Sequence, residues 1–286
     1  MSFRSGTVQY HRRAIQHVVE VMRTDPGARL DLEAMAAVAA MSRFHFLRVF
    51  EEVTAVSPAR LLTALRMHQA KRMLLETSLP VTDVCFETGY NSLGTFTRLF
   101  TYFIGVSPSS FRKLGEALAQ RPTAALAWGD LPRQPPPRPV RSIVGTVRGP
   151  AGFDGPIFVG AFSSPIPQHR PMSGGLLLQQ GPFELELPQD DPPSCLMAAG
   201  FPANLNGVGY LLPSATEVLV ASVPLRAEVY GGPLLAYDLA LRPMEPFDPP
   251  ILTALPLLLE RDHSIFAILE KRLRGETDYS IQSRYW

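Results

Sequence analysis

Residues 81–113 read VTDVCFETGYNSLGTFTRLFTYFIGVSPSSFRK, and this stretch decides the fold of the first half of the chain. Apolar residues recur at Phe96, Leu99 and Phe100, an i, i+3, i+4 spacing that is typical of one buried helix face. Ser92 comes before that run, and a serine hydroxyl at this place can accept a hydrogen bond from a free N–H of the first turn. A short apolar segment and a glycine-containing turn precede the serine. The stretch therefore predicts two short helices joined by a tight turn.

The same pattern occurs a second time, 50 residues earlier in the chain. A shift of 50 residues places Arg48–Val49–Phe50 over Arg98–Leu99–Phe100, and Val56–Ser57–Pro58 over Val106–Ser107–Pro108. The earlier copy supplies an apolar segment, a turn, a capping serine and a second apolar stripe: Leu32, Met35, Ala36 and Val38; Ala39–Ala40, which matches Gly89–Tyr90; Ser42; and Phe46, Val49 and Phe50. The first half of the chain therefore predicts two helix-turn-helix units.

A longer helix is predicted between the two copies, over Pro58–Thr77. Proline stands at its first helical position, where it is tolerated, and Ser57 is the expected cap. About 20 residues at 1.5 Å each span roughly 30 Å. Successive major-groove faces on one side of a DNA duplex lie roughly 34 Å apart. A helix of this length suits two reading units over adjacent grooves.

Residues 7–115 resemble the DNA-binding region of the AraC/XylS family of bacterial transcription regulators. The resemblance rests on three segments, of which the last is the most specific: LEAMAAVAAMSRFHFLRVF, SPARLLTALRMHQAKRMLL and the stretch quoted at the start. The family pattern in that stretch is matched at ten positions: Gly89, Tyr90, Phe96, Arg98, Phe100, Gly105, Ser107, Pro108, Phe111 and Arg112. The resemblance covers about 40% of the chain.

The resemblance implies that bases are read by the second helix of each unit. The implied base-contact residues are Arg43, Phe44, Leu47 and Arg48 in the first unit, and Leu93, Gly94, Thr97 and Arg98 in the second. Arg48 and Arg98 are the best candidates for bidentate contacts to guanine. The alternative for either arginine is a solvated or core-edge residue that pairs with a carboxylate such as Glu51. Leu47, Leu93 and Gly94 offer no side-chain donor, so recognition there would lean on shape and backbone contacts.

Phosphate contacts position a protein on DNA without reading its sequence. The candidates are polar or basic residues of the helical half: Ser42, Arg66, Lys71, Arg72, Thr95, Arg112 and Lys113. The alternative for each is an ordinary exposed helix face. His45 is expected on the helix surface or near phosphates and not among the readers.

Charge and proline content divide the chain. Residues 1–121 carry 15 Lys+Arg and 10 Asp+Glu, whereas residues 122–286 carry 12 and 16. Residues 1–122 hold 5 of the 28 prolines, and because proline is excluded from helix interiors only this part can be helical throughout. We predict a double helix-turn-helix DNA-binding domain, a proline-rich linker and a β-rich effector-binding or interaction domain, at residues 1–120, 121–139 and 140–286 respectively.

The second half alternates short β-like runs with turn signals. The predicted runs are RSIVGTVRG, PIFVGAF, GLLLQQ, PFELELP, SCLMAAGF, GYLLP, EVLVASV and LLAYDLALRP. They favour a mostly-β, sandwich-like domain, with a C-terminal helix predicted at Ala254–Arg274. Several of them are similar to prealbumin-like sandwiches such as carboxypeptidase regulatory-like modules. A gyrase-inhibitor-like α+β effector-binding domain remains the alternative.

These features predict a sequence-specific DNA-binding transcription factor and not an enzyme. The expected partners are double-stranded DNA, RNA polymerase and a small-molecule effector of unspecified identity. A constitutive DNA-binding module whose second half only dimerises or contacts polymerase is the alternative. Cys85 and Cys195 form neither a disulfide framework nor a metal spacing, so no cofactor or metal is expected. With no apolar run long enough to span a bilayer and no leader pattern, a cytoplasmic location is predicted.

Overall fold

The computed structural model describes residues 2–119, 140–188, 193–225, 236–254 and 284–285. The chain divides into two compact units. The first unit holds residues 1–111 together with residues 245–252, a segment that we call the strap. The second unit holds residues 112–244 and 253–286. The two-part organisation differs from the predicted boundaries, because the strap comes from far along the chain and belongs to the first unit.

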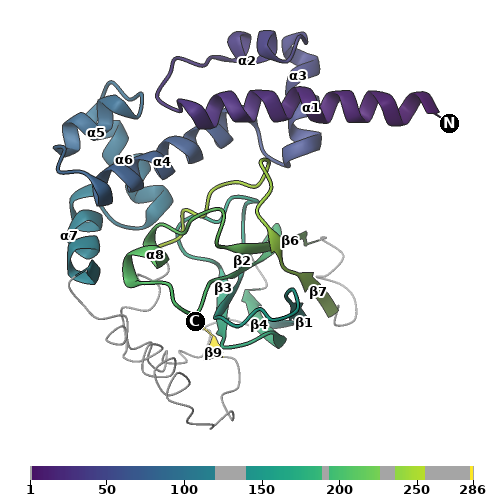
Figure 1. Ribbon diagram of the computed structural model, residues 1–286, viewed down its shortest axis with the longest axis vertical. Helices are drawn as coiled ribbons and strands as arrows, with labels where there is room; N and C mark the ends of the chain where they lie inside the picture. Colours follow the sequence, from purple (N-terminus) through teal and green to yellow (C-terminus); the bar gives the residue numbers. More distant parts are fainter. Residues whose placement is uncertain (1, 120–139, 189–192, 226–235, 255–283, 286) are drawn as a thin grey trace. The chain divides into compact units, whose positions relative to one another are not determined.

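The first unit is helical, and α4 occupies its middle (Figure 1). Its helices are α1 (Ser2–Thr24), α2 (Leu32–Val38), α3 (Arg43–Thr54), α4 (Pro58–Glu76), α5 (Val81–Glu87), α6 (Leu93–Ile104) and the start of α7 (Pro108–Ala119). Helix α4 contacts α3 toward one end and α5 and α6 toward the other, whereas α1 contacts α2, α3 and α4. The observed α4 ends one residue before the predicted helix.

Each of the two predicted turns contains a residue in the left-handed region. Ala40 has φ of 52° after α2, and Gly89 has φ of +82° after α5. The three predicted capping serines, Ser42, Ser57 and Ser92, lie at N-cap positions, but only Ser92 accepts a side-chain hydrogen bond, from Thr95 N at 3.4 Å. Ser42 and Ser57 make no side-chain cap bond, so the capping contacts expected there are wrong although both helices begin as predicted.

Aromatic residues at the predicted spacing form the core of both helical pairs. Phe46 and Phe50 of α3 and Phe96 and Phe100 of α6 have exposed fractions of 0%. The rings of Phe46 and Phe50 meet edge-on with centroids 5.4 Å apart, and those of Phe96 and Phe100 are tilted at 45° with centroids 5.9 Å apart. The short apolar segment expected before the second turn is Val84, Cys85 and Phe86; the first two are buried, but Phe86 is 60% exposed on α5.

The described residues of the second unit form two β-sheets. One has the order β4-β1-β7, and the other has the order β8-β6-β5-β2-β3-β9. The strands are β1 (Val140–Arg148), β2 (Ile157–Phe162), β3 (Ser173–Leu177), β4 (Gly181–Pro188), β5 (Cys195–Gly200), β6 (Leu219–Pro224), β7 (Ala236–Ala240), β8 (Arg242–Pro243) and β9 (Arg284–Tyr285). All pairs are antiparallel except β1 with β7, where Val144 lies opposite Ala236.

Side chains of both sheets share one apolar core. Ile143 and Leu185 of the smaller sheet and Val159 and Leu196 of the larger sheet belong to the same buried cluster. Strands β2 and β5 are buried along their whole lengths, as central strands covered on both sides are. The mostly-β character predicted for this part of the chain is therefore confirmed.

One predicted strand is a helix. The run GYLLP was expected to be β-like, but the structure has helix α8 (Gly207–Leu211) there. Asn206 caps this helix by accepting a hydrogen bond from Gly209 N at 2.7 Å. In a strand, the side chains of two neighbouring residues point to opposite faces. Here the neighbours Tyr210 and Leu211 are both buried.

Two predictions concern residues that the structure does not describe. The proline-rich linker at 121–139 lies outside the described residues, and so does the C-terminal helix predicted at Ala254–Arg274, apart from its first residue. Among the helices that are described, none has both the length and the apolar character needed to cross a bilayer.

Candidate nucleic-acid interface

Helix α3 presents an exposed face made of its first residues and Arg48. Phe44 is 80% exposed and lies outside the aromatic core. The Arg43 guanidinium lies 5.9 Å from the centre of the Phe44 ring and forms an ion pair with Glu33 of α2. Arg43 is thus held by a carboxylate in the free protein, and would have to leave or share this partner in order to reach a base.

Arg48 is held by a chain of two histidines. Its Nη2 lies 3.3 Å from His45 Nδ1, and His45 Nε2 lies 3.4 Å from His11 Nε2 of α1. A guanidinium only donates, so His45 Nδ1 accepts and, in the neutral ring, Nε2 carries the proton toward His11. The partner of Arg48 is therefore a histidine, and the ion pair with Glu51 considered from the sequence is not formed.

Helix α6 presents a smaller and less polar face. Leu93 is 41% exposed, and a Cβ placed on Gly94 would meet only Ser92 Oγ, at 4.0 Å. Thr97 is half-buried and Arg98 is exposed. The open space at Gly94 permits close approach of a large ligand to the backbone at the start of the helix. Among the described residues, no histidine or carboxylate is hydrogen-bonded to Arg98 in the way that His45 is to Arg48.

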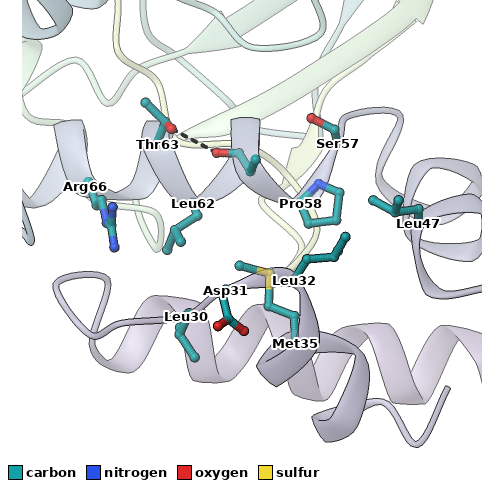
Figure 2. Close-up of a pocket in the computed structure, with 11 residues that line it drawn as sticks. Leu30, Asp31, Leu32, Met35, Leu47, Ser57, Pro58, Leu62, Thr63 and Arg66 are labelled. Atoms are coloured by element: carbon teal, nitrogen blue, oxygen red, sulfur yellow. Dashed lines mark hydrogen bonds between the residues drawn. The ribbon is translucent and has the colours of Figure 1, made fainter. Parts of the chain in front are cut away.

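A pocket of about 360 Å³ lies between α2, α3 and the first turns of α4 (Figure 2). Its lining is mainly apolar, and Leu47 contributes from α3. Thr63 does not offer its proton to the pocket, because its Oγ1 donates to Ala59 O at 2.8 Å (Figure 2). Leu47 is half-buried, so it has less surface for a base than the other candidates on α3.

The candidate phosphate contacts divide by exposure. Arg66 has internal partners, because its Nε donates to Pro26 O at 2.8 Å and its Nη2 to Ala28 O at 3.0 Å. Arg112 is half-buried and has a partner within the protein. The exposed candidates are Ser42, Arg72, Thr95 and Lys113.

Lys71 corrects one sequence prediction. It was expected to contact phosphate, but its exposed fraction is 0%, and Nζ donates to Ile251 O at 3.1 Å and Leu252 O at 3.3 Å. Burial lowers the pKa of Lys71 to about 7. The side chain is therefore not available to DNA in this structure, and its partners are backbone carbonyls of the strap.

Three residues of α1 were not predicted from the sequence. His11 contacts His45 of α3, and Arg12 and Arg23 contact the strap. A signal for the helix itself was present, because Ile15, Val18 and Met22 follow the spacing of one apolar face and are buried. The spacing gives no information on the partners of the polar residues, which lie from 34 to 233 positions away in the chain.

Comparison with known proteins agrees with this geometry. Residues 35–114 match the protein family described as a helix-turn-helix domain. Over 102 residues the chain is 32% identical to the RCS-specific HTH-type transcriptional activator RclR of Escherichia coli K12, and the match covers 36% of each protein. Over 98 residues it is 30% identical to the lactose operon transcription activator of Staphylococcus xylosus, covering 34% of this chain and 35% of that one.

A solved structure also matches the helical part. The DNA-binding domain of AdpA, in complex with a target DNA, is 30% identical, with a TM-score of 0.35; the match covers 36% of this chain and 93% of that one. The chain spans about a third of the length of the curated regulators just named. Residues 35–114 of this chain therefore match a helix-turn-helix domain, and the similar curated proteins are named as transcription activators.

Proposed function

We propose that this protein is a sequence-specific DNA-binding transcription regulator that reads two adjacent major-groove segments. One observation carries the proposal: two helix-turn-helix pairs with exposed second helices are joined by the single helix α4. Its 19 residues span about 28 Å at 1.5 Å per residue, close to the roughly 34 Å between successive major-groove faces. Double-stranded DNA is therefore the proposed partner.

The base-reading residues stay as proposed from the sequence, with the geometry now ranking them. Arg48 and Arg98 are exposed cations at matching positions and are the primary readers. Phe44 is proposed to contact a thymine methyl; its exposure as an apolar side chain at the start of α3 supports this. Phosphate contacts are assigned to the exposed candidates Ser42, Arg72, Thr95 and Lys113 and to the N–H groups at the starts of α3 and α6.

The second unit is proposed to regulate DNA binding and has no assigned enzymatic activity. Its two sheets with a common core support a sandwich-like domain of the kind expected from the sequence. A small-molecule effector and RNA polymerase are its proposed partners, and a cytoplasmic location follows from the proposed role. The alternative role, a module that only dimerises or contacts polymerase, is distinguished by thermal shift of the full chain against effector panels, because ligands that bind the native state raise the unfolding temperature.

The test begins with selection of duplexes that the full-length protein retains from a random DNA library. A consensus of roughly two helical turns with two unlike halves is expected, because one chain carries two reading helices. The consensus duplex and a scrambled duplex are then titrated at two salt concentrations. Equal affinity for the two duplexes, or a consensus that is a perfect inverted repeat bound only by dimers, would contradict the proposal.

A further inference from the structure

The strap, with sequence EPFDPPIL at residues 245–252, is bound by three cationic side chains of the helical unit. Arg12 of α1 forms an ion pair with Glu245 at 2.9 Å, and its guanidinium lies 4.7 Å from the centre of the Phe247 ring. Arg23, near the end of the same helix, donates to Pro246 O at 3.2 Å and to Asp248 O at 2.6 Å. Lys71 of α4 donates to the last two carbonyls of the strap.

The composition of the strap suits this mode of binding. Its three prolines, at 246, 249 and 250, have no N–H, so they add carbonyl acceptors to the segment without adding donors. The start of the strap is fixed by its own turn, in which Glu245 N donates to Asp248 Oδ2 at 2.6 Å and Asp248 N donates to Glu245 O at 3.0 Å. An acidic, proline-rich segment of this kind complements a surface formed by two arginines and a lysine.

Docking of the strap also removes apolar surface from water. Phe247, Ile251 and Leu252 have exposed fractions of 9%, 8% and 0%. The Lys71 ammonium is fully buried, and among the described residues it donates to the strap carbonyls, with the centre of the Phe111 ring 5.8 Å away. Without the strap this ammonium would lose both carbonyl acceptors, so docking and the packing of α1 and α4 stabilise each other.

Both flanks of the strap belong to the second unit. The preceding strand β8 pairs with β6, where Leu219 lies opposite Pro243. The following residue, Thr253, donates its N–H to Pro167 O at 3.0 Å. Eight residues between two anchors therefore connect the β-sheet unit to α1 and α4, in addition to the single crossing of the chain within α7.

We propose that the strap is a docked positioning element of the DNA-binding unit, and that it transmits the state of the second unit to the two reading helices. This proposal rests on the proposed function, because it assumes that the helical unit binds DNA. Docking of the strap holds α1 against α4, the helix that sets the spacing of the two helix-turn-helix pairs. Movement of either flank loosens the strap, and the affinity for specific DNA falls.

The test uses the full-length protein with Phe247→Ala and, separately, Lys71→Met. Hydrogen–deuterium exchange of peptides that contain the strap is measured beside affinity for the selected duplex and for a scrambled one. We expect faster exchange in the strap and a loss of specific affinity of about fivefold or more in each variant, within the range of typical coupling between sites. The salt dependence of binding should stay unchanged, since Phe247 carries no charge.

Arg12→Ala and Arg13→Ala form a matched control on the exposed side of α1. Both residues are exposed cations, and only Arg12 contacts the strap among the contacts of the described residues. Arg12→Ala should loosen the strap and weaken specific binding more than Arg13→Ala does. This pair of variants still tests the proposal if Lys71→Met does not fold.

Two results would overturn the inference while leaving the proposed function intact. One is faster exchange in the strap with specific affinity within twofold of the parent protein. The other is weakening by Lys71→Met alone, on both duplexes and with a salt slope lower by about one unit, which is the behaviour of a lost phosphate contact. Failure of the proposed function looks different, because the parent protein would then not distinguish the selected duplex from the scrambled one.

Discussion

The two helix-turn-helix pairs follow similar backbone paths but have different residues at the left-handed positions. Head one (α2 and α3) has alanines at its two left-handed positions, Ala40 with φ of 52° and Ala55 with φ of 58°. Head two (α5 and α6) has glycines at the equivalent places, Gly89 and Gly105. A residue with a Cβ costs roughly 1–2 kcal/mol in this region. Head one therefore contains local strain that head two avoids.

The turns also differ in length. A backbone hydrogen bond closes each turn, from Met41 N to Ala36 O in head one and from Tyr90 N to Cys85 O in head two. The residues of these two bonds are 49 positions apart in the chain. The N-cap serines of α3 and α6, in contrast, are 50 positions apart. Head two thus has one additional residue, which corresponds to Asn91, between the turn and its reading helix. The two heads therefore share their aromatic packing, whereas the helices proposed to read DNA differ in sequence and in the turn before them.

The largest expected effect concerns the matched arginines. Arg48→Ala and Arg98→Ala should each cost about 1–3 kcal/mol on the selected duplex if each arginine contacts a guanine edge. Arg48→Ala should lose more specificity, because the histidine chain holds Arg48 in place and head one has a second cation, Arg43. The measurement is a titration of each variant against selected and scrambled duplexes at two salt concentrations.

Arg72→Ala is the control for this comparison, because Arg72 is an exposed cation of α4 outside both reading helices. A phosphate contact there should weaken binding to both duplexes alike and lower the salt slope by about one unit. If Arg48→Ala weakened binding to both duplexes equally, Arg48 would contact phosphate instead of a base, and its assignment as a base-reading residue would be wrong.

Exchanging the turn residues tests the difference in backbone strain. Gly89→Ala should lower the free energy of unfolding by about 2 kcal/mol, since φ of +82° disfavours a Cβ and an added Cβ would lie 2.6 Å from Gly27 O. Ala40→Gly at the equivalent turn of head one should change stability little or raise it by up to about 1 kcal/mol. Urea unfolding of the full chain measures both, and a stable Gly89→Ala variant would contradict the argument.

Local patterns were sufficient to predict both heads and the helix between them. The expected helix Pro58–Thr77 and the observed α4 differ by one residue, because proline and serine mark its start unambiguously. The buried phenylalanines of α3 and α6 follow from the i, i+4 spacing alone. Several strand runs of the second half were also predictable, since short apolar segments between turn residues are a local signal, but GYLLP proved to be helix α8.

Contacts between distant residues were not predictable in this way. Lys71 looks like a surface cation in the sequence of α4, and its burial follows from carbonyl partners that lie 180 and 181 positions later. The strap gives no local signal for docking, because a proline-rich acidic segment is also typical of a loop. The roles of His11 and Arg23 depend on the same kind of long-range pairing.

A change of pH should alter the stability of the protein through Lys71 of α4, the helix between the two heads. The pKa of Lys71 falls to about 7 through burial, whereas its unfolded value is near 10.5. Between these values the unfolded chain binds more protons, so stability should rise with pH from 7 to 9, by at most about 1.4 kcal/mol per pH unit. Urea unfolding of the full chain at several pH values should show this rise, and Lys71→Met should remove it.

His68 does not interfere in this pH range. Burial, and then the charges of Lys71, Arg23 and Arg72, lower the pKa of His68 to about 3. Its contribution to stability is lost only as pH falls below about 6.5, when the unfolded chain takes up the proton first. An unchanged rise between pH 7 and 9 in Lys71→Met would show that another group causes it.

The smallest expected effect tests whether the histidine chain distinguishes head one from head two. His11→Ala removes the partner of His45, so the Arg48 guanidinium loses part of its orientation, and specific affinity should fall by about 0.5–1 kcal/mol, the value of one hydrogen bond. His17→Ala is the control, because His17 is an exposed histidine on α1 whose Nδ1 lies 4.0 Å from Glu20. A double-mutant cycle decides the matter: combined with Arg48→Ala, His11→Ala should have no further effect, whereas combined with Arg98→Ala its effect should add in full. Additive losses in both combinations would mean that His11 acts independently of Arg48, and the two heads would then present their arginines in the same way.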